Sequence, residues 1–511
     1  MKYYMGIDIG TTNLKAAVFR EDGELVSYHS ESTPVSHPKP FFSEMDPMEV
    51  WEKIKICIRE NVKQCPAKEI CSVAVSSMGE AGILVEEQGR PLNPFILWYD
   101  TRSEAQYKRL ETAVGYDRLY EITGQIPSVK YGISKLLWLK ENDWELYQRA
   151  SHWLSVEDWI IYCLSGKYAT DYSVAARTLA FDVHTCNWSD EIIEAAGLKK
   201  QLFPKAVPGG TAVGRLKPEI SVELGLNKEM IVATGGHDHS CAAIAVNIQK
   251  EGVMLDSMGT AEVLMMAFDH VLPFEVLRKS GYSVYPHCGK RKYRLLSSNQ
   301  ACGVCLQWYF KNMGRDLETE AKKTGVSRYA LLEKQILLQR SQNEKLLFFP
   351  FLRGSAENSE LMGTFWGMSD TDRPGDYAGA IIDGMAFELR RQTEDYIQLA
   401  QLEKPVVRIA GGLSKSDYIM RRKNKIQGVP VEVPVCTEAA CFGAALLGAI
   451  AAGHLSFEEL ENFCRIQYIF REGQPCEYAA KFTQYKNIRE QIGRLYMQLR
   501  DESFLCKENY E

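Results

Sequence analysis

Asp8-Ile9-Gly10-Thr11-Thr12-Asn13 forms a glycine and threonine turn near the start of the chain, between two segments that are typical of β-strands. About 250 residues later, Asp256-Ser257-Met258-Gly259-Thr260-Ala261 repeats part of this pattern in the same setting. A turn of this kind after a strand exposes consecutive backbone N–H groups, which bind phosphate oxygens together with neighbouring hydroxyls. One such turn would favour an ordinary hairpin. The pair predicts a duplicated fold that holds a nucleotide between its halves.

Length and composition describe an ordinary soluble protein of two domains. The chain has 511 residues, more than one core usually supports, so we expect a first domain at 1–247 and a second at 248–511. Apolar residues make up 45% and charged residues 25%. A net charge of −6 gives no reason to expect a nucleic-acid partner. No run of 18 apolar residues exists, so we expect no membrane partner.

The cysteines and the N-terminus favour a cytoplasmic location. The 14 cysteines are scattered, and the closest pairs, such as Cys302 and Cys305, lack a second pair or histidine ligands. We therefore expect reduced, mostly buried thiols. The N-terminus runs directly into a strand-like segment, with no long apolar stretch and no cleavage site.

Periodicity predicts an α/β protein with a mixed sheet in each half. In the first half we expect strands at 2–9, 14–20, 24–30, 70–76 and 231–233, a hairpin over 82–98, and helices at 47–64, 134–141, 155–164 and 241–246. In the second half we expect strands at 252–256, 262–267, 406–409 and 431–433, helices at 380–399, 417–427 and 439–453, and a surface helix beyond about residue 490.

Two carboxylates stand at predicted strand ends and suit phosphate chemistry. Asp8 at the mouth of the first turn can hold Mg²⁺ through water, or it can cap its own turn. Lys15 adds a positive charge beside it. Asp238, in Thr234-Gly235-Gly236-His237-Asp238-His239, can accept a proton from a substrate hydroxyl. The flanking histidines also permit a metal-dependent hydrolase, although three successive residues are poorly spaced to ligate one ion.

Two further segments suit a polyhydroxylated ligand. Trp98-Tyr99-Asp100-Thr101-Arg102 offers a ring for C–H faces and charges for hydroxyls; the alternative is a core tryptophan beside a surface ion pair. Glu80 is either a hydroxyl acceptor or an exposed loop charge.

A pair of glycines, Gly411 and Gly412, ends another predicted strand and would let a ring or a phosphate approach the backbone. The chain contains neither GxGxxG nor GxxxxGK[ST], so a nucleotide must be bound on another scaffold.

These segments, in this order, resemble the FGGY family of carbohydrate kinases, which includes glycerol kinase, xylulokinase and gluconokinase. The resemblance runs from about residue 3 to about residue 455 and rests on residues 6–18, 98–102, 235–242, 257–263, 380–389 and 410–453. It implies two ribonuclease-H-like domains, of the actin, hexokinase and heat-shock-ATPase architecture, around a central cleft. The first domain would bind the sugar and carry the catalytic base, and the second would bind the nucleotide.

The resemblance also assigns roles to individual residues. Asp238 matches the catalytic base, and the substrate side comprises Glu80, Trp98, Asp100, Arg102, Asp238 and His239. Contacts to ATP and its phosphates would come from Gly10, Thr11, Thr12, Asn13, Lys15, Gly259, Thr260, Gly303, Gln307, Gly411, Gly412 and Ser416. Two departures concern substrate choice: Gly79 stands where glycerol kinase has an arginine, and His239 replaces a glutamine or asparagine.

The expected activity is transfer of the γ-phosphoryl group of ATP, with Mg²⁺, to a hydroxyl of a small carbohydrate. A pentulose such as xylulose is the first expectation, with other ketoses, polyols and sugar acids as alternatives. The competing classes are the hydrolase above and a non-kinase ATPase or sensor of the same fold. A homodimer is a further expectation, since dimers are common among such proteins.

Overall fold

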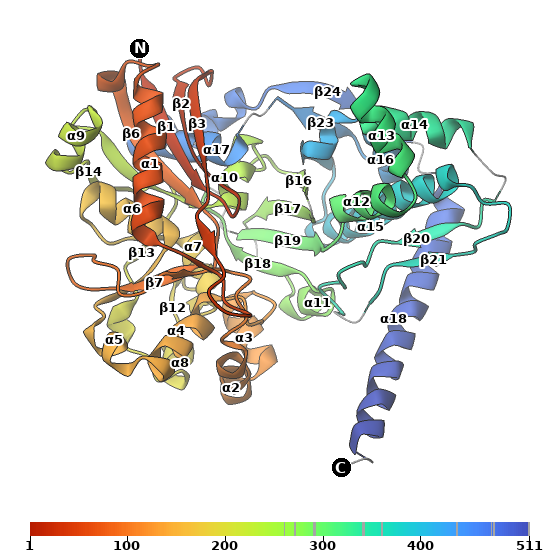
Figure 1. Cartoon of the computed structure of the whole chain (residues 1–511), viewed down its shortest axis with the longest axis horizontal. Helices are drawn as coiled ribbons and strands as arrows, with labels where there is room; N and C mark the ends of the chain where they lie inside the picture. The colour runs from red at the N-terminus through yellow and green to blue at the C-terminus, as the bar shows by residue number, and fades with distance from the viewer. Residues whose placement is uncertain are drawn as a thin grey trace.

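The computed structural model describes residues 1–259, 261–269, 272–289, 293–339, 343–358, 361–435, 438–471, 473 and 476–508. Figure 1 shows two halves side by side, with the N-terminus at the top of the first half. The C-terminal helix extends beyond the body of the second half. Each half is built around one large sheet.

The first sheet has six strands in the order β14-β15-β6-β1-β2-β3. Strands β1, β6 and β15 are parallel, and β1, β2 and β3 form an antiparallel meander. The bounds are β14 Ala212–Arg215, β15 Ile231–His237, β6 Ile70–Ser77, β1 Tyr3–Ile9, β2 Asn13–Arg20 and β3 Leu25–Ser32.

The second sheet repeats this arrangement. Its order is β18-β19-β17-β16-β22-β23-β24, in which β16, β22 and β23 are parallel and β16, β17 and β19 form the meander. The bounds are β18 Ser283–Pro286, β19 Tyr293–Asn299, β17 Glu262–Phe268, β16 Val253–Met258, β22 Val406–Gly411, β23 Val431–Pro434 and β24 Ile466–Phe470. The predicted duplication of an α/β unit with a mixed sheet is therefore confirmed.

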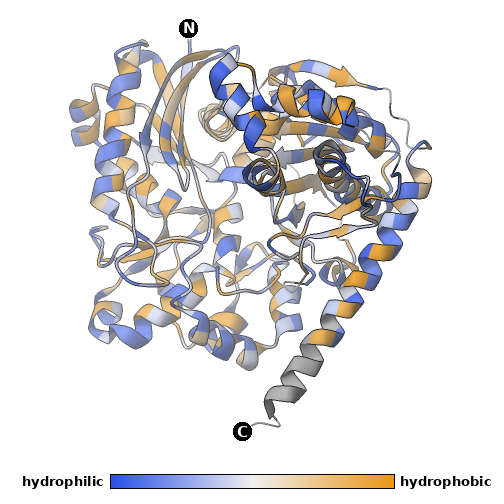
Figure 2. Cartoon of the chain, turned by 45° about the vertical axis from the view of Figure 1, so that its right-hand side comes forward, coloured by the Kyte–Doolittle hydropathy of each residue, from blue (hydrophilic) through white to orange (hydrophobic). Residues whose placement is uncertain are grey.

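Helices cover both sheets, and apolar faces drive their packing. In the first half these are α1 Pro47–Val62, α2 Glu104–Val114, α3 Tyr116–Thr123, α4 Gly132–Asn142, α5 Trp144–Arg149, α6 Val156–Ser165, α7 Tyr172–Ala175, α8 Asp190–Ala195, α9 Pro218–Leu224 and α10 Asp238–Ala245. In the second half they are α11 Phe274–Lys279, α12 Gly303–Asn312, α13 Arg315–Thr324, α14 Arg328–Leu338, α15 Pro374–Ala400, α16 Asp417–Gln427, α17 Ala439–Ala451 and α18 Ala479–Glu508. The outer helices alternate hydrophilic and hydrophobic residues along their length (Figure 2).

Smaller sheets complete the fold. A five-stranded sheet in the first half comprises β4 Val35–Ser36, β5 Glu44–Met45, β8 Phe95–Ile96, β7 Gly82–Val85 and β9 His152–Ser155. Three two-stranded sheets pair β10 Thr170–Asp171 with β13 Ala206–Val207, β11 Phe181–Asp182 with β12 Asn187–Trp188, and β20 Leu347–Phe349 with β21 Thr364–Trp366. Within the described part of the chain, no helix is long and apolar enough to span a membrane.

Each half packs one helix against the other half. Helix α17 of the second half packs against β1, β6 and β15 of the first sheet, so closely that a Cβ on Gly6 would collide with the Cys441 carbonyl oxygen. Helix α10 of the first half shares a hydrophobic cluster with Leu255 and Met265 of the second sheet. The last strand of the first sheet ends at residue 237 and the first strand of the second sheet begins at residue 253, so the expected boundary lies between the sheets. Helices α10 and α17, however, each pack against the other half.

The main local error of the sequence analysis concerns the segment around Asp238. The strand expected at 231–233 runs to His237, and the helix begins at Asp238 rather than at residue 241. The composition of Gly235-Gly236 is typical of a loop. In the structure Gly235 lies against the Val75 backbone, where a Cβ would collide with the Val75 carbonyl oxygen. Gly235 therefore serves close strand packing, whereas Gly236 lies against the side chains of Ser173 and Asp171. Asp238 stands at a strand-to-helix junction.

Candidate active site

The first turn lies between β1 and β2 and keeps two amides free. The Gly10 N–H donates to the Asn13 carbonyl at 3.0 Å, and the Thr33 hydroxyl donates to the Gly10 carbonyl at 2.8 Å. Among the described residues, the backbone N–H groups of Thr11 and Thr12 have no hydrogen-bond partner. Both residues are at least partly exposed. The turn thus presents two successive amides and two hydroxyls, which is the chemistry that a phosphate requires.

Asp8 lies at the carboxyl end of β1 and faces Asp238 across the parallel strands. In the register, Asp8 pairs with Ser76 of β6, and Ser76 pairs with Gly236 of β15. The Ser76 hydroxyl donates to Asp8 at 3.0 Å. Burial and then the negative charge of Asp238 raise the pKa of Asp8 to about 7, although Lys15 opposes the shift. The alternative that Asp8 caps its own turn is not seen, since that turn closes through its backbone.

Lys15 connects the first turn with the second half of the chain. It lies opposite Asp8 in the β1–β2 register, and its ammonium group contacts Glu438 at 2.7 Å. Glu438 directly precedes α17 and has a left-handed backbone, with φ of 55°. The lysine is therefore already neutralised in part by a residue from the second half.

Asp238 is the first residue of α10, and its carboxylate is 31% exposed. It accepts a hydrogen bond from the His239 amide at 2.6 Å, and the His237 ring nitrogen Nε2 lies 3.3 Å away. No lysine or arginine forms an ion pair with it in the part of the chain that the structure describes. Burial lowers the pKa of both histidines. Asp238 is thus an accessible carboxylate between neutral rings.

A buried polar layer holds the strand that precedes Asp238. The Ser173 hydroxyl accepts from the His237 amide at 2.9 Å, and Glu157 accepts from the Gly235 amide at 3.0 Å. Asp171 in turn accepts from the Ser173 amide at 2.7 Å. Burial raises the pKa of Asp171 to about 7. Sequence reasoning missed Glu157 and Ser173, because their function depends on contacts across the fold.

The second turn assembles a cluster of glycine backbones. Gly259 donates to the Ala261 carbonyl at 2.9 Å and accepts from the Gly303 amide at 3.1 Å. Gly411 pairs with Met258 in the register, with φ of 109°, and a Cβ there would collide with the Met258 carbonyl oxygen. Gly412 has open space around it. Thr260 lies outside the described residues.

Two other residues of the predicted nucleotide side lie on helices beside this cluster. Gln307 is exposed on α12, which begins at Gly303. The Ser416 hydroxyl caps α16 by accepting from the Ile419 amide at 3.5 Å. The predicted nucleotide contacts of the second half therefore gather where β16 and β22 end.

Glu80 is buried and forms an ion pair with Arg177. The interpretation of Glu80 as an exposed loop charge is therefore wrong. Arg177 also donates to the Gln125 side-chain oxygen at 2.9 Å, and its guanidinium lies over the rings of Tyr131 and Tyr285. A Cβ on Gly79 would meet Arg177 and His237, so the glycine makes room for this cluster.

The alternative of a core tryptophan beside a surface ion pair is wrong, because the positions of the ring and the ion pair are the other way round. The indole is 40% exposed and donates to the Thr11 hydroxyl at 3.2 Å, whereas the ion pair is buried. Asp100 is fully buried and accepts from Arg102 and from the Ser43 amide. Arg102 also contacts Glu44 at 2.7 Å. The exposed Trp98 ring thus contacts the first turn, while Asp100 and Arg102 pair with each other in the interior.

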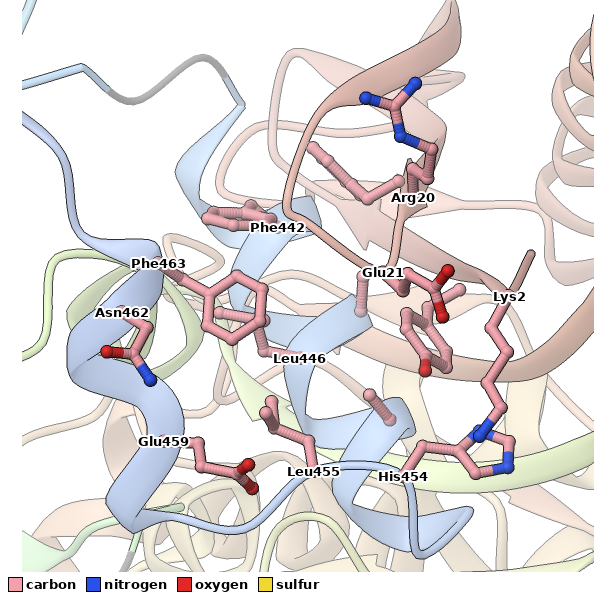
Figure 3. A pocket seen from close by; sticks show the side chains of 14 residues that line it. Lys2, Arg20, Glu21, Phe442, Leu446, His454, Leu455, Glu459, Asn462 and Phe463 are labelled. Carbon is pink, nitrogen blue, oxygen red and sulfur yellow. The ribbon is translucent and has the colours of Figure 1, made fainter.

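A separate cavity lies away from all of these residues. It has a volume of about 250 Å³ and lies between the start of β1, the end of β2 and α17. Figure 3 shows Arg20, Glu21, His454 and Glu459 around it, with Phe442 and Phe463 among its apolar walls. None of its lining residues was predicted as a site residue.

Comparison with known proteins places the chain in a family. The FGGY family of carbohydrate kinases matches over both of its domains, the N-terminal domain at residues 3–245 and the C-terminal domain at residues 254–452. Gluconokinase from Bacillus subtilis is 26% identical over 98% of this chain and 98% of its own length. Xylulose kinase from Escherichia coli is 27% identical over 97% of this chain and 99% of its own.

Solved structures show the same fold. A ligand-bound xylulose kinase from Lactobacillus acidophilus superimposes with a TM-score of 0.87 at 22% identity, covering 98% of this chain and all of that one. A Plasmodium falciparum glycerol kinase with ADP superimposes with a TM-score of 0.85 at 21% identity, covering 96% of this chain and 98% of that one.

The chain belongs to the FGGY family of carbohydrate kinases, and it is an ATP-dependent carbohydrate kinase with two actin-like ATPase domains. The family assignment decides against the metal-dependent hydrolase; in the described part of the chain, no group of three or more potential ligands is arranged to hold a metal ion. The relatives carry different substrate names, so the acceptor is a separate question.

Proposed function

We propose that this kinase phosphorylates a hydroxyl group of a small ketose, polyol or sugar acid, with Asp238 as the general base. One observation supports this most: Asp238 is an accessible carboxylate that forms no ion pair with a lysine or arginine among the described residues. It follows the carboxyl end of β15, which β6 separates from β1, the strand that leads to the free amides of Thr11 and Thr12. A base must lie within reach of the hydroxyl that it deprotonates, and the phosphate must lie close to that hydroxyl.

In the proposed reaction, the γ-phosphoryl group of ATP is transferred to the acceptor hydroxyl. The acceptor hydroxyl gives its proton to the Asp238 carboxylate, and its oxygen forms a bond with the γ-phosphorus. The bond between that phosphorus and the β,γ-bridging oxygen breaks, and ADP leaves with the electron pair. The Thr11 and Thr12 amides stabilise charge on the transferred group from one side. Little covalent work falls to the protein, so positioning and electrostatics dominate.

The carboxylates present fit a Mg²⁺ ion bound to phosphates. Burial and then the negative charge of Asp238 raise the pKa of Asp8, and a divalent cation would relieve the repulsion between the two carboxylates. Mg²⁺ prefers hard oxygen ligands and keeps several waters, so it does not require three protein ligands. When bound, it would neutralise charge on the β- and γ-phosphates. In this proposal Asp8 holds the ion through a water ligand.

The remaining residues fall into two groups. On the acceptor side, Trp98 offers a ring face, Glu80 and His239 offer polar atoms, and the Asp100–Arg102 pair holds the segment in place. On the nucleotide side we assign Gly10, Asn13, Lys15, Gly259, Thr260, Gly303, Gln307, Gly411, Gly412 and Ser416. In this proposal the enzyme is cytoplasmic and its cysteines are reduced. Homodimer formation stays a prediction.

A coupled ADP-release assay tests the function. The wild-type enzyme is assayed with Mg²⁺ and ATP against ketoses, polyols, aldoses and aldonic acids. We expect at least one acceptor to stimulate ADP release well above the acceptor-free rate, and we expect EDTA to abolish the stimulation until Mg²⁺ is restored. Failure of every carbohydrate to stimulate ADP release would contradict the proposal.

A further inference from the structure

Arg294 is a fully buried arginine without a charge partner. It lies in β19 and has 0% of its surface exposed. One nitrogen, Nη2, donates to the Tyr285 hydroxyl, but Nε and Nη1 have no hydrogen-bond partner among the described residues. No described carboxylate forms an ion pair with it. Burying an unpaired charge is costly, so such a group indicates a missing anionic partner.

Arg408 in the same sheet shows how a structural arginine is satisfied here. Its Nε contacts Glu432 at 3.0 Å, and its Nη1 donates to the carbonyl oxygens of Val246 and Asn247. Arg408 is thus buried with a carboxylate and two carbonyls around it. Arg294 has the same burial without that set of acceptors. The difference favours a binding role for Arg294 over a purely structural one.

Arg294 faces the first half of the protein. Its neighbour in the strand, Tyr293, belongs to the core on the far side of the sheet. On the near side, its guanidinium lies 4.4 Å from the ring centre of Tyr285, which packs with Tyr131 of the first half. Arg177 lies 5.3 Å from the same ring. The positive charge of Arg294 also helps to lower the pKa of His237 and His239, which flank Asp238.

The surroundings of Arg294 contain further buried polar atoms without hydrogen-bond partners among the described residues. Arg177 Nε and Gln125 Nε2 are buried without an acceptor, and both ring nitrogens of His287 lack a partner among the described residues. Glu80 already neutralises Arg177. The charge of Arg294 therefore stays unbalanced where the two halves meet beside the base. A neutral ketose or polyol would supply hydroxyl oxygens only, whereas a carboxylate would supply two acceptors and one negative charge.

We propose that the acceptor of this kinase is an open-chain sugar acid whose carboxylate is bound by Arg294, at the opposite end from the hydroxyl that Asp238 deprotonates. This inference rests on the proposed function and replaces xylulose as the first expectation. The first half would then carry the base, and the second half would bind the carboxylate of the acceptor through Arg294.

The test compares aldonates with neutral sugars of equal carbon number, such as gluconate with sorbitol and xylonate with xylulose. For the wild type we expect kcat/KM to be about 10²-fold or more higher for the aldonates, since removing one partner of a buried charge pair has effects of this size. In Arg294→Met we expect the aldonate value to fall about 10²-fold, mainly through KM, with neutral sugars little changed. Arg294→Lys should recover part of the loss, because it keeps the charge without the planar fork.

Arg408→Met is the matched control, because it removes a buried arginine from the same sheet. It should lower thermal stability and leave the ratio of aldonate to neutral activity unchanged. A measurement on the wild type alone covers the case in which Arg294→Met does not fold: aldonate should raise the melting temperature, and the matched polyol should not. A wild type that prefers a neutral sugar overturns the inference while the kinase function stands. A wild type that no sugar stimulates overturns the proposed function itself.

Discussion

The two turn-bearing hairpins have the same topology but place their aspartates on opposite faces. In each hairpin three residues separate the strands, after Ile9 in the first and after Met258 in the second. Gly10 therefore corresponds to Gly259, and Asp8 corresponds to Ser257 rather than to Asp256. In a strand, successive side chains point to opposite faces. A shift of one residue is enough to turn the second aspartate away from the other half.

The consequence is a different chemistry for each carboxylate. Gly6 and Asp8 face α17, where Asp8 lies near Asp238 and Lys15. Asp256 shares a face with Met254 and Met258, in the core beneath α15 and α16. There Lys423 forms ion pairs with Asp256 at 2.7 Å and with Glu262, and all three side chains are buried. The first aspartate is the one to which we assign a functional role, and the second is neutralised by Lys423.

The largest expected effect tests the chemistry of the first half. Asp238→Asn keeps the shape of the side chain but cannot accept the proton. We expect turnover to fall about 10²- to 10⁴-fold, the usual contribution of a general base. ATP binding, followed by isothermal titration, should be retained. Turnover near the wild-type value would remove Asp238 from the role of base.

The next effect tests the second half. Lys423→Met leaves Asp256 and Glu262 buried without a cation, and breaking such a group costs about 3–5 kcal/mol. We expect that loss in the free energy of unfolding, measured by urea titration. Lys425→Met on the same helix is the control, because Lys425 is exposed and should change stability little. Equal losses in both variants would contradict the ion-pair interpretation.

Asp8→Asn should behave in the opposite way to Lys423→Met. The folded-state pKa of Asp8 is raised from 3.8 to about 7, so the folded protein binds its proton more tightly than the unfolded chain. The contribution of Asp8 to the stability of the folded state is therefore greatest below pH 4, and it is lost as the pH rises toward 7. In metal-free buffer, Asp8→Asn should gain stability over the wild type between pH 5 and 8, by at most about 4 kcal/mol.

The same variant should lose most of its kinase activity, because the amide carries no charge for Mg²⁺. Thermal unfolding across the pH range, together with the ADP-release assay, separates the two effects. If Asp8→Asn is less stable than the wild type at pH 8, the carboxylate contributes to the fold in the way that Asp256 does.

The smallest effect concerns the side chain that joins the first turn to the acceptor side. Trp98→Phe removes the hydrogen bond to Thr11 and keeps an aromatic ring. A neutral hydrogen bond contributes about 0.5–1.5 kcal/mol, so we expect kcat/KM to fall by up to about tenfold. Thr11→Val should cost a similar amount, and the double variant should cost little more than either single one. Full additivity in this cycle would show that the two side chains act independently.

Much of this arrangement could be predicted because it depends on local sequence. The strands before and after both turns, the helix at Asp417–Gln427 and the duplicated order of elements all follow from apolar periodicity and turn residues. The position of Asp238 at the end of a strand was also predicted. Its strand is longer than expected, because Gly235 is required by close packing against β6, and Gly236 by its positive φ and its contacts with Ser173 and Asp171, rather than by a turn.

The contacts around the candidate site could not be predicted, since they join residues far apart in the chain. Arg177 reaches Glu80 and Lys15 reaches Glu438, across 97 and 423 positions. Arg294 stands between Tyr293 and the pair Leu295 and Leu296 in β19, and a charged residue among these apolar neighbours was a local signal that could have drawn attention to it.

The sequence by itself determined that two α/β units carry two turns and two strand-end carboxylates, Asp8 and Asp238, because hydrogen bonding and side-chain alternation along each strand are local properties. Only the tertiary structure decided which aspartate faces the other half, which charges are paired and which buried guanidinium forms no ion pair with a described carboxylate. Those outcomes depend on which surfaces exclude water together, and that is settled when the two sheets pack with helices α10 and α17.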